Sequence, residues 1–91
     1  MPLDGIRFFF TKDGKVLNEV MVEAPFKGSV DGIKIGDAAD DVVARRGQPY
    51  AIAEVYGGSG YLYRAGGNIL RYDIDEKTKK ITDIVQILDR Q

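Results

Sequence analysis

Turn-forming residues divide the second half of this chain into segments that are too short for anything but strands. The turns fall at residues 57–60, 65–67 and 76–79, where glycines or charged residues interrupt each apolar pattern. The segments around them are residues 50–56, 61–64, 68–75 and 80–88. Short strands at this spacing are typical of an antiparallel meander. The sequence therefore predicts four consecutive antiparallel strands here.

An alternating segment at residues 6–22 predicts a further β-hairpin near the start of the chain. Its turn can be built in two ways that pair different residues. A turn of two residues pairs Phe10 with Leu17 and moves Glu19 onto the face of the apolar side chains. Because a slip of one residue moves a whole strand to its other face, the apolar pattern decides between the two registers.

The register that the pattern favours has a turn of three residues, with Gly14 in the left-handed region and a bulge beside it. It pairs Phe10 with Val16 and Ile6 with Val20. One face of the hairpin then gathers the apolar residues Ile6, Phe8, Phe10, Val16, Val20 and Val22. We predict this register.

One helix is predicted, over about residues 38–46. Asp37 precedes it as the expected N-cap, and further carboxylates in its first turn complement the helix dipole. Gly47 and Pro49 end it, because glycine favours a helix C-terminus and proline cannot continue the helix. Its apolar face is small and consists of Ala39, Val42 and Val43.

The length of 91 residues limits the chain to one domain, since domains typically have roughly 50–250 residues and a second core would not fit. We predict a single domain over residues 1–91, made of the hairpin at 6–22 and the helix and meander at 33–88. The predicted class is α+β. One short helix packs on a curved four-stranded antiparallel sheet, and the N-terminal hairpin is an addition to it.

The chain contains no cysteine and no histidine. Disulfides, thiolate zinc sites, cysteine nucleophiles and histidine-based acid–base chemistry are therefore excluded. The carboxylate-rich stretches at residues 37–41 and 73–76 fit a helix cap and a solvated turn better than a metal-binding loop. We expect no catalytic residues, no metal site and no cofactor.

The net charge of −1 comes from 13 basic and 14 acidic residues, which leaves no basic face for a nucleic acid. No stretch approaches the roughly 20 apolar residues of a membrane span. The first residues do not resemble a signal peptide. We expect neither a nucleic-acid nor a membrane partner, and a cytoplasmic location. The alternative, a location in the cell envelope, requires a leader that is missing from this chain.

Residues 33–88 carry a pattern of helix caps, a Gly-x-Pro turn and Tyr-rich strands. The matching residues are Ile35, Gly36, Asp37, Val42, Gly47, Pro49, Tyr61, Tyr63, Tyr72, Ile81 and Ile84. This pattern resembles the domain of the β-lactamase inhibitor protein and of small outer-membrane-assembly lipoproteins of the OmlA/BamE type. The resemblance implies helical elements on a four-stranded sheet with a protein-binding face. The chain departs from that family in its N-terminal hairpin and in having no cysteine to lipidate.

Tyrosine is enriched at interfaces, because its ring supplies contact area at low entropic cost while its hydroxyl stays hydrated. Tyr61 and Tyr63 share one face of their strand. Such residues either cover the edge of the core or form a patch for a partner. We predict partner-binding residues at Tyr56, Tyr61, Tyr63, Tyr72 and Phe9.

These observations together predict a non-enzymatic protein-binding module. One form of it is a bacterial inhibitor or immunity-type protein that covers a partner with its Tyr-bearing sheet face. The alternative is a structural or assembly module that acts through self-association. A small ligand carrier or hydrolase is a third, weaker interpretation.

Three consecutive phenylalanines at residues 8–10 give the hairpin apolar side chains on both faces. A hairpin alone is only marginally stable, and its open edge is a template for another chain. We therefore predict a homodimer in which the hairpins pair or pack across a two-fold axis. In the alternative, the hairpin extends its own sheet and a partner protein covers the second face.

Overall fold

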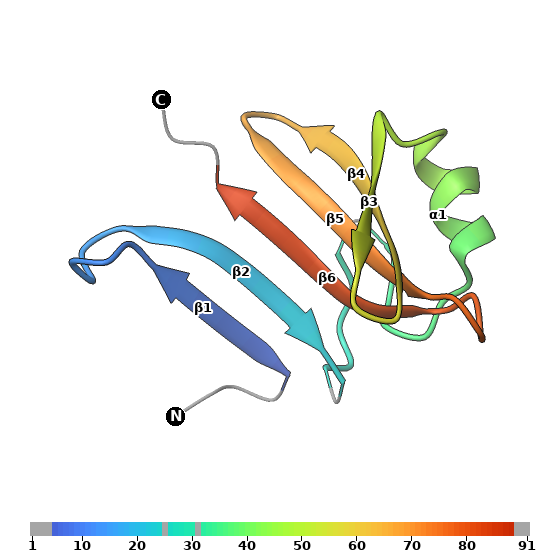
Figure 1. Ribbon diagram of the computed structural model, residues 1–91, viewed down its shortest axis with the longest axis horizontal. Helices are drawn as coiled ribbons and strands as arrows, with labels where there is room; N and C mark the ends of the chain where they lie inside the picture. Colours follow the sequence, from blue (N-terminus) through green and yellow to red (C-terminus); the bar gives the residue numbers. More distant parts are fainter. Residues whose placement is uncertain (1–4, 25, 31, 89–91) are drawn as a thin grey trace.

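A computed structural model describes residues 5–24, 26–30 and 32–88, and these residues form one six-stranded sheet and one helix (Figure 1). The strands are β1 (Ile6–Phe10), β2 (Leu17–Glu23), β3 (Ala51–Val55), β4 (Gly58–Ala65), β5 (Asn68–Asp75) and β6 (Ile81–Leu88), and helix α1 is Ala39–Arg46. The order across the sheet is β1-β2-β6-β5-β4-β3, and every neighbouring pair is antiparallel. Among these six described strands, β2 and β6 are the one neighbouring pair that is not consecutive in the sequence.

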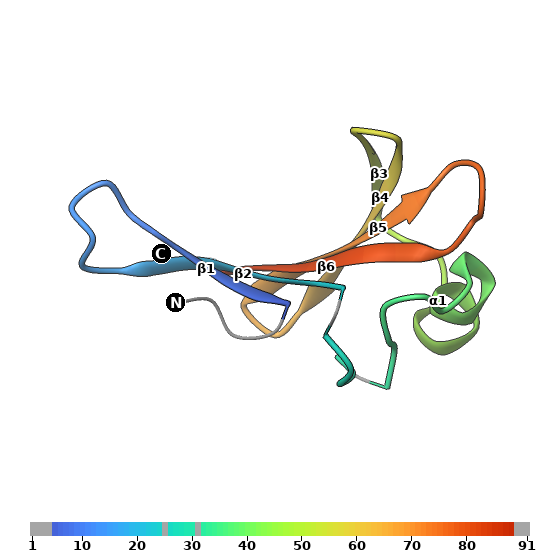
Figure 2. The same ribbon diagram turned by 90° about the horizontal axis from the view of Figure 1, so that it is seen from below.

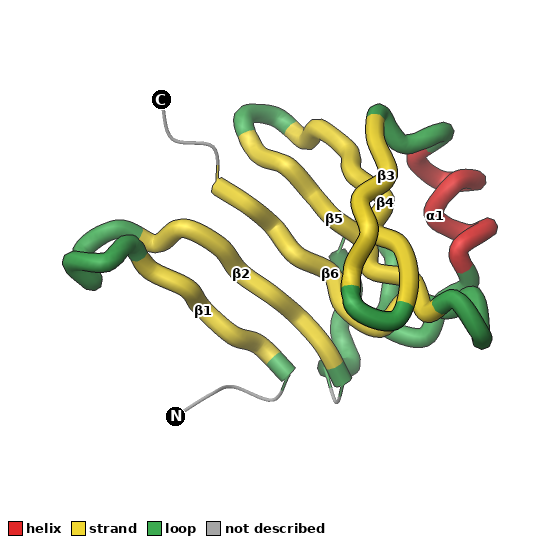
Figure 3. Tube along the Cα trace, in the orientation of Figure 1, coloured by secondary structure: helices red, strands yellow, loops and turns green. Residues whose placement is uncertain are grey.

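The sheet has one covered side and one side without a helix (Figure 2). Helix α1 and the segment before it lie on the covered side, while the β3–β4 hairpin rises toward the other side. Figure 3 shows that the helix lies at the end of the sheet that holds β3 and β4, away from β1 and β2. Within the described part of the chain, no helix packs over the first hairpin.

Alternation along the strands sends one set of side chains toward α1, and this set forms the core. We call this side of the sheet the helix face. Val22, Ile84 and Tyr72 are cross-strand neighbours in one row of it. Leu70 and Tyr63 are neighbours in the next row. All five side chains are buried. The opposite side of the sheet is called the open face below.

The helix supplies only part of the cover over this core. Val42 is fully buried and Ala39 packs at the margin, as predicted, whereas Val43, the third residue of the predicted apolar face, is only half-buried and is not part of the core. The loop before the helix supplies the rest, because Ile33 is 1% exposed and both Phe26 and Val30 pack against the core. A sheet of this width is covered by a helix and a loop acting together.

The predicted α+β class is confirmed, but the N-terminal hairpin is not a separate addition. Strand β2 pairs with β6 from Glu19, opposite Ile87, to Glu23, opposite Asp83. The hairpin therefore extends the meander into a single sheet, as in the alternative to a hairpin paired across a dimer. The strand predictions are closest for β5 and β6, whose observed limits differ from the predicted ones by at most one residue.

The turn of the first hairpin is formed as predicted at Gly14. Its φ angle is 72°, in the left-handed region that glycine adopts without strain. Its N–H donates to the carbonyl oxygen of Thr11 at 2.8 Å. The carboxylate of Asp13 accepts hydrogen bonds from the Thr11 hydroxyl and, at 3.0 Å, from the N–H of Lys15.

The predicted register of this hairpin is wrong. Ile6 pairs with Val22 rather than with Val20. Phe10 pairs with Leu17, as in the alternative with a two-residue turn, rather than with Val16. The bulge lies within the strand pair, where the register shifts just before Phe10. The observed partner of Ile6 differs from the predicted one by two residues, so the apolar side chains stay on the predicted face. The apolar pattern alone therefore does not distinguish the observed register from the predicted one.

The helix ends as predicted but begins differently. Asp37 is not the N-cap; Ala38 occupies that position, and no side chain caps the helix. Instead, the carboxylate of Asp41 accepts a hydrogen bond from the N–H of Ala38 at 3.2 Å, and that of Asp37 accepts one from the N–H of Lys34 at 2.9 Å. At the other end Gly47, with φ of 83°, stops the helix.

The glycine-rich loop expected before β4 is a two-residue turn, and Gly58 and Gly60 belong to the strand itself. A side-chain carbon at Gly58 would overlap the backbone carbonyl oxygen of Ile74 on β5. One at Gly60 would lie 2.9–3.0 Å from side-chain atoms of Arg71 and Asp73. Glycine within a strand often marks such a close approach.

Candidate interaction surfaces

Two of the predicted partner-binding tyrosines lie in the core. Tyr63 and Tyr72 are buried beneath α1, and their rings meet edge to face with centroids 5.7 Å apart. The Tyr63 hydroxyl donates to the carbonyl oxygen of Gly47 at 2.9 Å, and Nε of Arg46 donates to the Tyr72 hydroxyl at 2.9 Å. Burial raises the pKa of both phenols. These tyrosines hold the end of α1 on the sheet and offer no surface to a partner.

The other three predicted residues lie in different places. Tyr61 packs at the margin of the core, beside Tyr72 in the strand register. Tyr56 is fully exposed in the turn between β3 and β4. Phe9 lies on β1, at the opposite end of the sheet order. The five predicted residues therefore do not form one surface.

Three exposed aromatic side chains follow one another along β1. Phe8, Phe9 and Phe10 are 47%, 39% and 54% exposed. Because side chains alternate along a strand, Phe8 and Phe10 lie on the helix-face side and Phe9 lies on the open face. This arrangement agrees with the two-sided apolar character that the sequence pattern indicates.

The backbone of β1 is paired on one side only. The N–H of Glu23 donates to the carbonyl oxygen of Gly5 at 2.8 Å, and the N–H of Thr11 donates to that of Val16 at 2.8 Å. N–H and C=O groups point to alternate sides along a strand, so the residues between these bonds can be assigned. Those directed away from β2 are Ile6, Phe8 and Phe10. No described strand lies on that side of β1.

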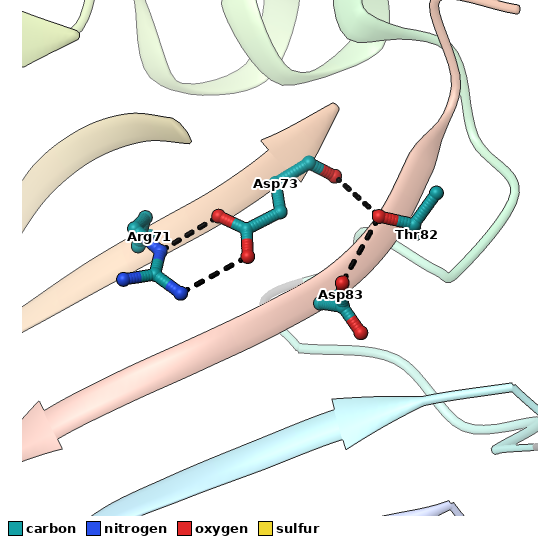
Figure 4. A network of polar contacts seen from close by, with 4 residues as sticks. All are labelled: Arg71, Asp73, Thr82 and Asp83. Carbon is teal, nitrogen blue, oxygen red and sulfur yellow. Dashed lines mark hydrogen bonds and ion pairs between the residues drawn. The ribbon is translucent and has the colours of Figure 1, made fainter. Parts of the chain in front are cut away.

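The open face carries a row of carboxylates next to two arginines. Glu23, Asp83 and Asp73 are consecutive cross-strand neighbours on β2, β6 and β5. Nε and Nη2 of Arg71 donate to the two oxygens of Asp73 at 2.7 and 3.0 Å (Figure 4). Nε of Arg7 lies 2.7 Å from a carboxylate oxygen of Glu23. Two of the three carboxylates are therefore paired with an arginine.

Asp73 does not belong to a solvated turn, contrary to the prediction from the sequence, but is 6% exposed. Burial raises its pKa, the bidentate pair with Arg71 opposes this increase, and the nearby charge of Asp83 adds to it. The Thr82 hydroxyl donates to the carboxylate of Asp83 at 3.0 Å (Figure 4). The Arg71 guanidinium thus offsets the negative charge of the buried Asp73 carboxylate, which lies next to the carboxylate of Asp83.

A cavity of about 340 Å³ lies beside this network, under the β3–β4 turn. Its lining includes Val55, Tyr56 and Ile74 as well as Arg71, Asp73 and Asp83. A ligand carrier would need a closed apolar pocket, whereas this cavity is lined partly by charged groups. We therefore do not assign a ligand to it.

Within residues 5–24, 26–30 and 32–88, no group of three or more metal-ligating side chains comes together. In the same residues, no helix is long and apolar enough to cross a bilayer.

Two solved structures share this fold. One is a DUF4309 family protein (YjgB) from Bacillus subtilis, with a TM-score of 0.67 and 15% identity over 91% of this chain and 55% of the other. The second is a cysteine-rich secretory protein (SAV1118) from Staphylococcus aureus, with a TM-score of 0.67 and 16% identity over 97% of this chain and 33% of the other. This chain thus spans about half and a third of their lengths. At these identities the likeness shows the fold alone.

No protein-family model and no curated protein sequence matches the chain. The resemblance to the β-lactamase inhibitor protein and to the OmlA/BamE-type lipoproteins stays a prediction.

Proposed function

We propose that this chain is a protein-binding module without catalytic activity, and that it binds by adding a strand of another polypeptide to the β1 edge. One observation carries the proposal. The outward N–H and C=O groups of Ile6, Phe8 and Phe10 coincide with three exposed phenyl rings on the same strand. Backbone hydrogen bonds to an added strand supply affinity, and side-chain contacts supply specificity.

The usual protections of a sheet edge are weak on β1. Proteins commonly shield such edges with charged side chains, with proline or with a bulge. β1 contains no proline, and its single charged residue, Arg7, is already paired with Glu23. The bulge of the hairpin is on β2, where Asn18 is the extra residue opposite the step from Phe9 to Phe10, so β1 itself carries no bulge. Burial of the exposed phenyl surface contributes roughly 25 cal/mol per Å² before the entropic cost of association is subtracted.

This proposal replaces the Tyr-bearing sheet face with the β1 edge as the binding element, because Tyr63 and Tyr72 are buried. An inhibitor or immunity role is a special case, in which the added strand belongs to the protein that is inhibited. Self-association is another special case. Neither form needs a cofactor.

The test is a Phe8→Pro variant. The N–H of Phe8 points away from β2, so its removal leaves the hairpin hydrogen bonds intact but blocks an incoming strand. Tagged wild-type and variant chains are expressed in the native host, and the bound proteins are identified by mass spectrometry. We expect the wild-type chain to retain a defined partner, which includes an untagged copy of itself, and Phe8→Pro to lose it.

The matched control is Ile52→Ser, which removes an exposed apolar side chain, 62% exposed, from the opposite edge strand β3. This variant should retain the partner. Circular dichroism must show that both variants keep the wild-type sheet content. If the partner is retained by Phe8→Pro, or if none is retained by the wild-type chain, the proposal is wrong.

A further inference from the structure

We infer that the strand added to β1 is β1 of a second copy of this chain, antiparallel and centred on Phe8. This inference rests on the proposed function and specifies its partner. In this register Phe8 of one copy pairs with Phe8 of the other, and Ile6 pairs with Phe10. The two sheets then form one continuous sheet with a two-fold axis at Phe8.

The direction of the backbone groups limits the possible registers. Within β1 (Ile6–Phe10), the outward N–H and C=O groups belong to Ile6, Phe8 and Phe10, so the hydrogen-bonded pairs of a β1–β1 contact form between these residues. The register centred on Phe8 is the one that pairs all three residues of both copies. Registers shifted by two or more positions along the strand leave at least one outward residue unpaired.

The side chains favour the same register. On the open face, Arg7 of each copy lies opposite Phe9 of the other, which places a guanidinium next to an aromatic ring twice. On the helix-face side, Phe8 lies opposite Phe8, and the row continues into Val20 of each β2. Aromatic and β-branched neighbours of this kind stabilise a sheet.

The two nearest alternatives are less favourable. A two-fold axis at Arg7 places the two arginines directly opposite each other, and like charges in that position are destabilising. An axis at Phe9 removes both Ile6 residues from the hydrogen-bonded set. Arg7 is the only charged residue of β1, so charge repulsion disfavours the register centred on Arg7, whereas the loss of hydrogen-bonded pairs disfavours the register centred on Phe9.

Cysteine cross-linking tests this register, because the chain has no cysteine of its own. Residues in a hydrogen-bonded antiparallel pair have Cα atoms about 5.5 Å apart, within the roughly 4.4–6.8 Å that a disulfide spans. A Phe8→Cys variant should therefore form a disulfide dimer under mild oxidation. In Phe10→Cys the two thiols would be about 13 Å apart, so this matched control should stay monomeric on a non-reducing gel.

A mixture of Ile6→Cys and Phe10→Cys chains should cross-link to each other, whereas each alone should not. Sedimentation equilibrium of the unmodified chain should give twice the monomer mass. A monomer mass at high micromolar concentration, or cross-linking of Phe10→Cys as strong as that of Phe8→Cys, would overturn the inference. In that case a different protein that the wild-type chain retains and Phe8→Pro loses would still support the proposed function.

Discussion

Single glycines control how closely the strands approach in this sheet. At Gly58 the β5 backbone leaves no room for a side-chain carbon, and at Gly60 the Arg71–Asp73 ion pair occupies that space. Neither role is visible in the sequence, where residues 57–60 resemble a flexible loop. The difference arises because local composition records the presence of glycines but not what lies across the strand from them.

A Gly58→Ala substitution should destabilise the protein by about 2 kcal/mol or more, because the new methyl group overlaps backbone that cannot move aside. The measurement is the free energy of unfolding from urea denaturation. Gly67→Ala is the control, since no neighbouring atom lies within 4 Å of the place that its new methyl carbon would take. Equal stabilities of the two variants would contradict the close packing of β4 and β5.

The pKa values of two aspartates of β5 should be shifted in opposite directions from the ordinary value. Burial raises the pKa of Asp73 above its ordinary value. The N–H groups of Thr78 and Lys77 lower the pKa of Asp75, to whose Oδ1 they donate at 3.0 and 2.7 Å. An NMR titration of the side-chain carboxyl carbons measures both values, and an Asp73 pKa below that of Asp75 would be inconsistent with this structure.

The sign of each stability effect follows from these shifts. Asp75 stabilises the fold above its unfolded-state pKa, and this contribution is lost as the pH falls through its lower folded-state pKa. Asp73 does the opposite, since its raised folded-state pKa makes its contribution more favourable as the pH falls through that value. The Asp73→Asn variant should therefore lose the second dependence and keep the first.

At the scale of elements, the sequence predicts the existence and type of each strand well and their pairing less well. The strands β5 and β6 and the end of α1 are predictable because alternation, turn residues and Gly47 agree locally. The register of the first hairpin is not, because its bulge depends on how β2 also pairs with β6. The burial of Tyr63 and Tyr72 is not predictable either, since alternation does not say which side the helix covers.

The turn of the first hairpin depends on one backbone conformation. Gly14→Val should cost about 1 kcal/mol or more, because a β-branched residue resists a φ angle of 72°. No neighbouring atom lies within 4 Å of the position, so the cost comes from the backbone alone. Gly14→Asn should cost less, because asparagine tolerates the left-handed region. Equal melting temperatures of the Val variant and the wild type would rule out this turn.

The contact between α1 and the sheet depends on buried tyrosine hydroxyls. Tyr63→Phe removes the hydrogen bond to Gly47 and should lower the free energy of unfolding by about 1 kcal/mol. Tyr56→Phe is the matched control, because that side chain is fully exposed, and it should change stability by less than about 0.5 kcal/mol. Thermal denaturation compares the two, and a larger effect at Tyr56 would contradict the assignment of these tyrosines.

At the scale of the whole molecule, the two ends of the sheet differ in kind. The end with β3 and β4 carries the helix, while the end with β1 and β2 carries the exposed phenylalanines (Figure 1). Strand β1 is one edge of the sheet and β3 is the other. An edge with outward backbone groups and apolar side chains is the feature on which the proposed binding depends.

Backbone amide hydrogen exchange, followed by NMR, tests the role of the β1 edge most directly. The N–H groups of Arg7 and Phe9 face β2 and should exchange slowly at every concentration. Those of Phe8 and Phe10 should exchange rapidly in dilute protein and become protected as the chain assembles at high micromolar concentration. If Phe8 and Phe10 exchange rapidly both in concentrated protein and in any isolated complex, the β1 edge is not the binding element.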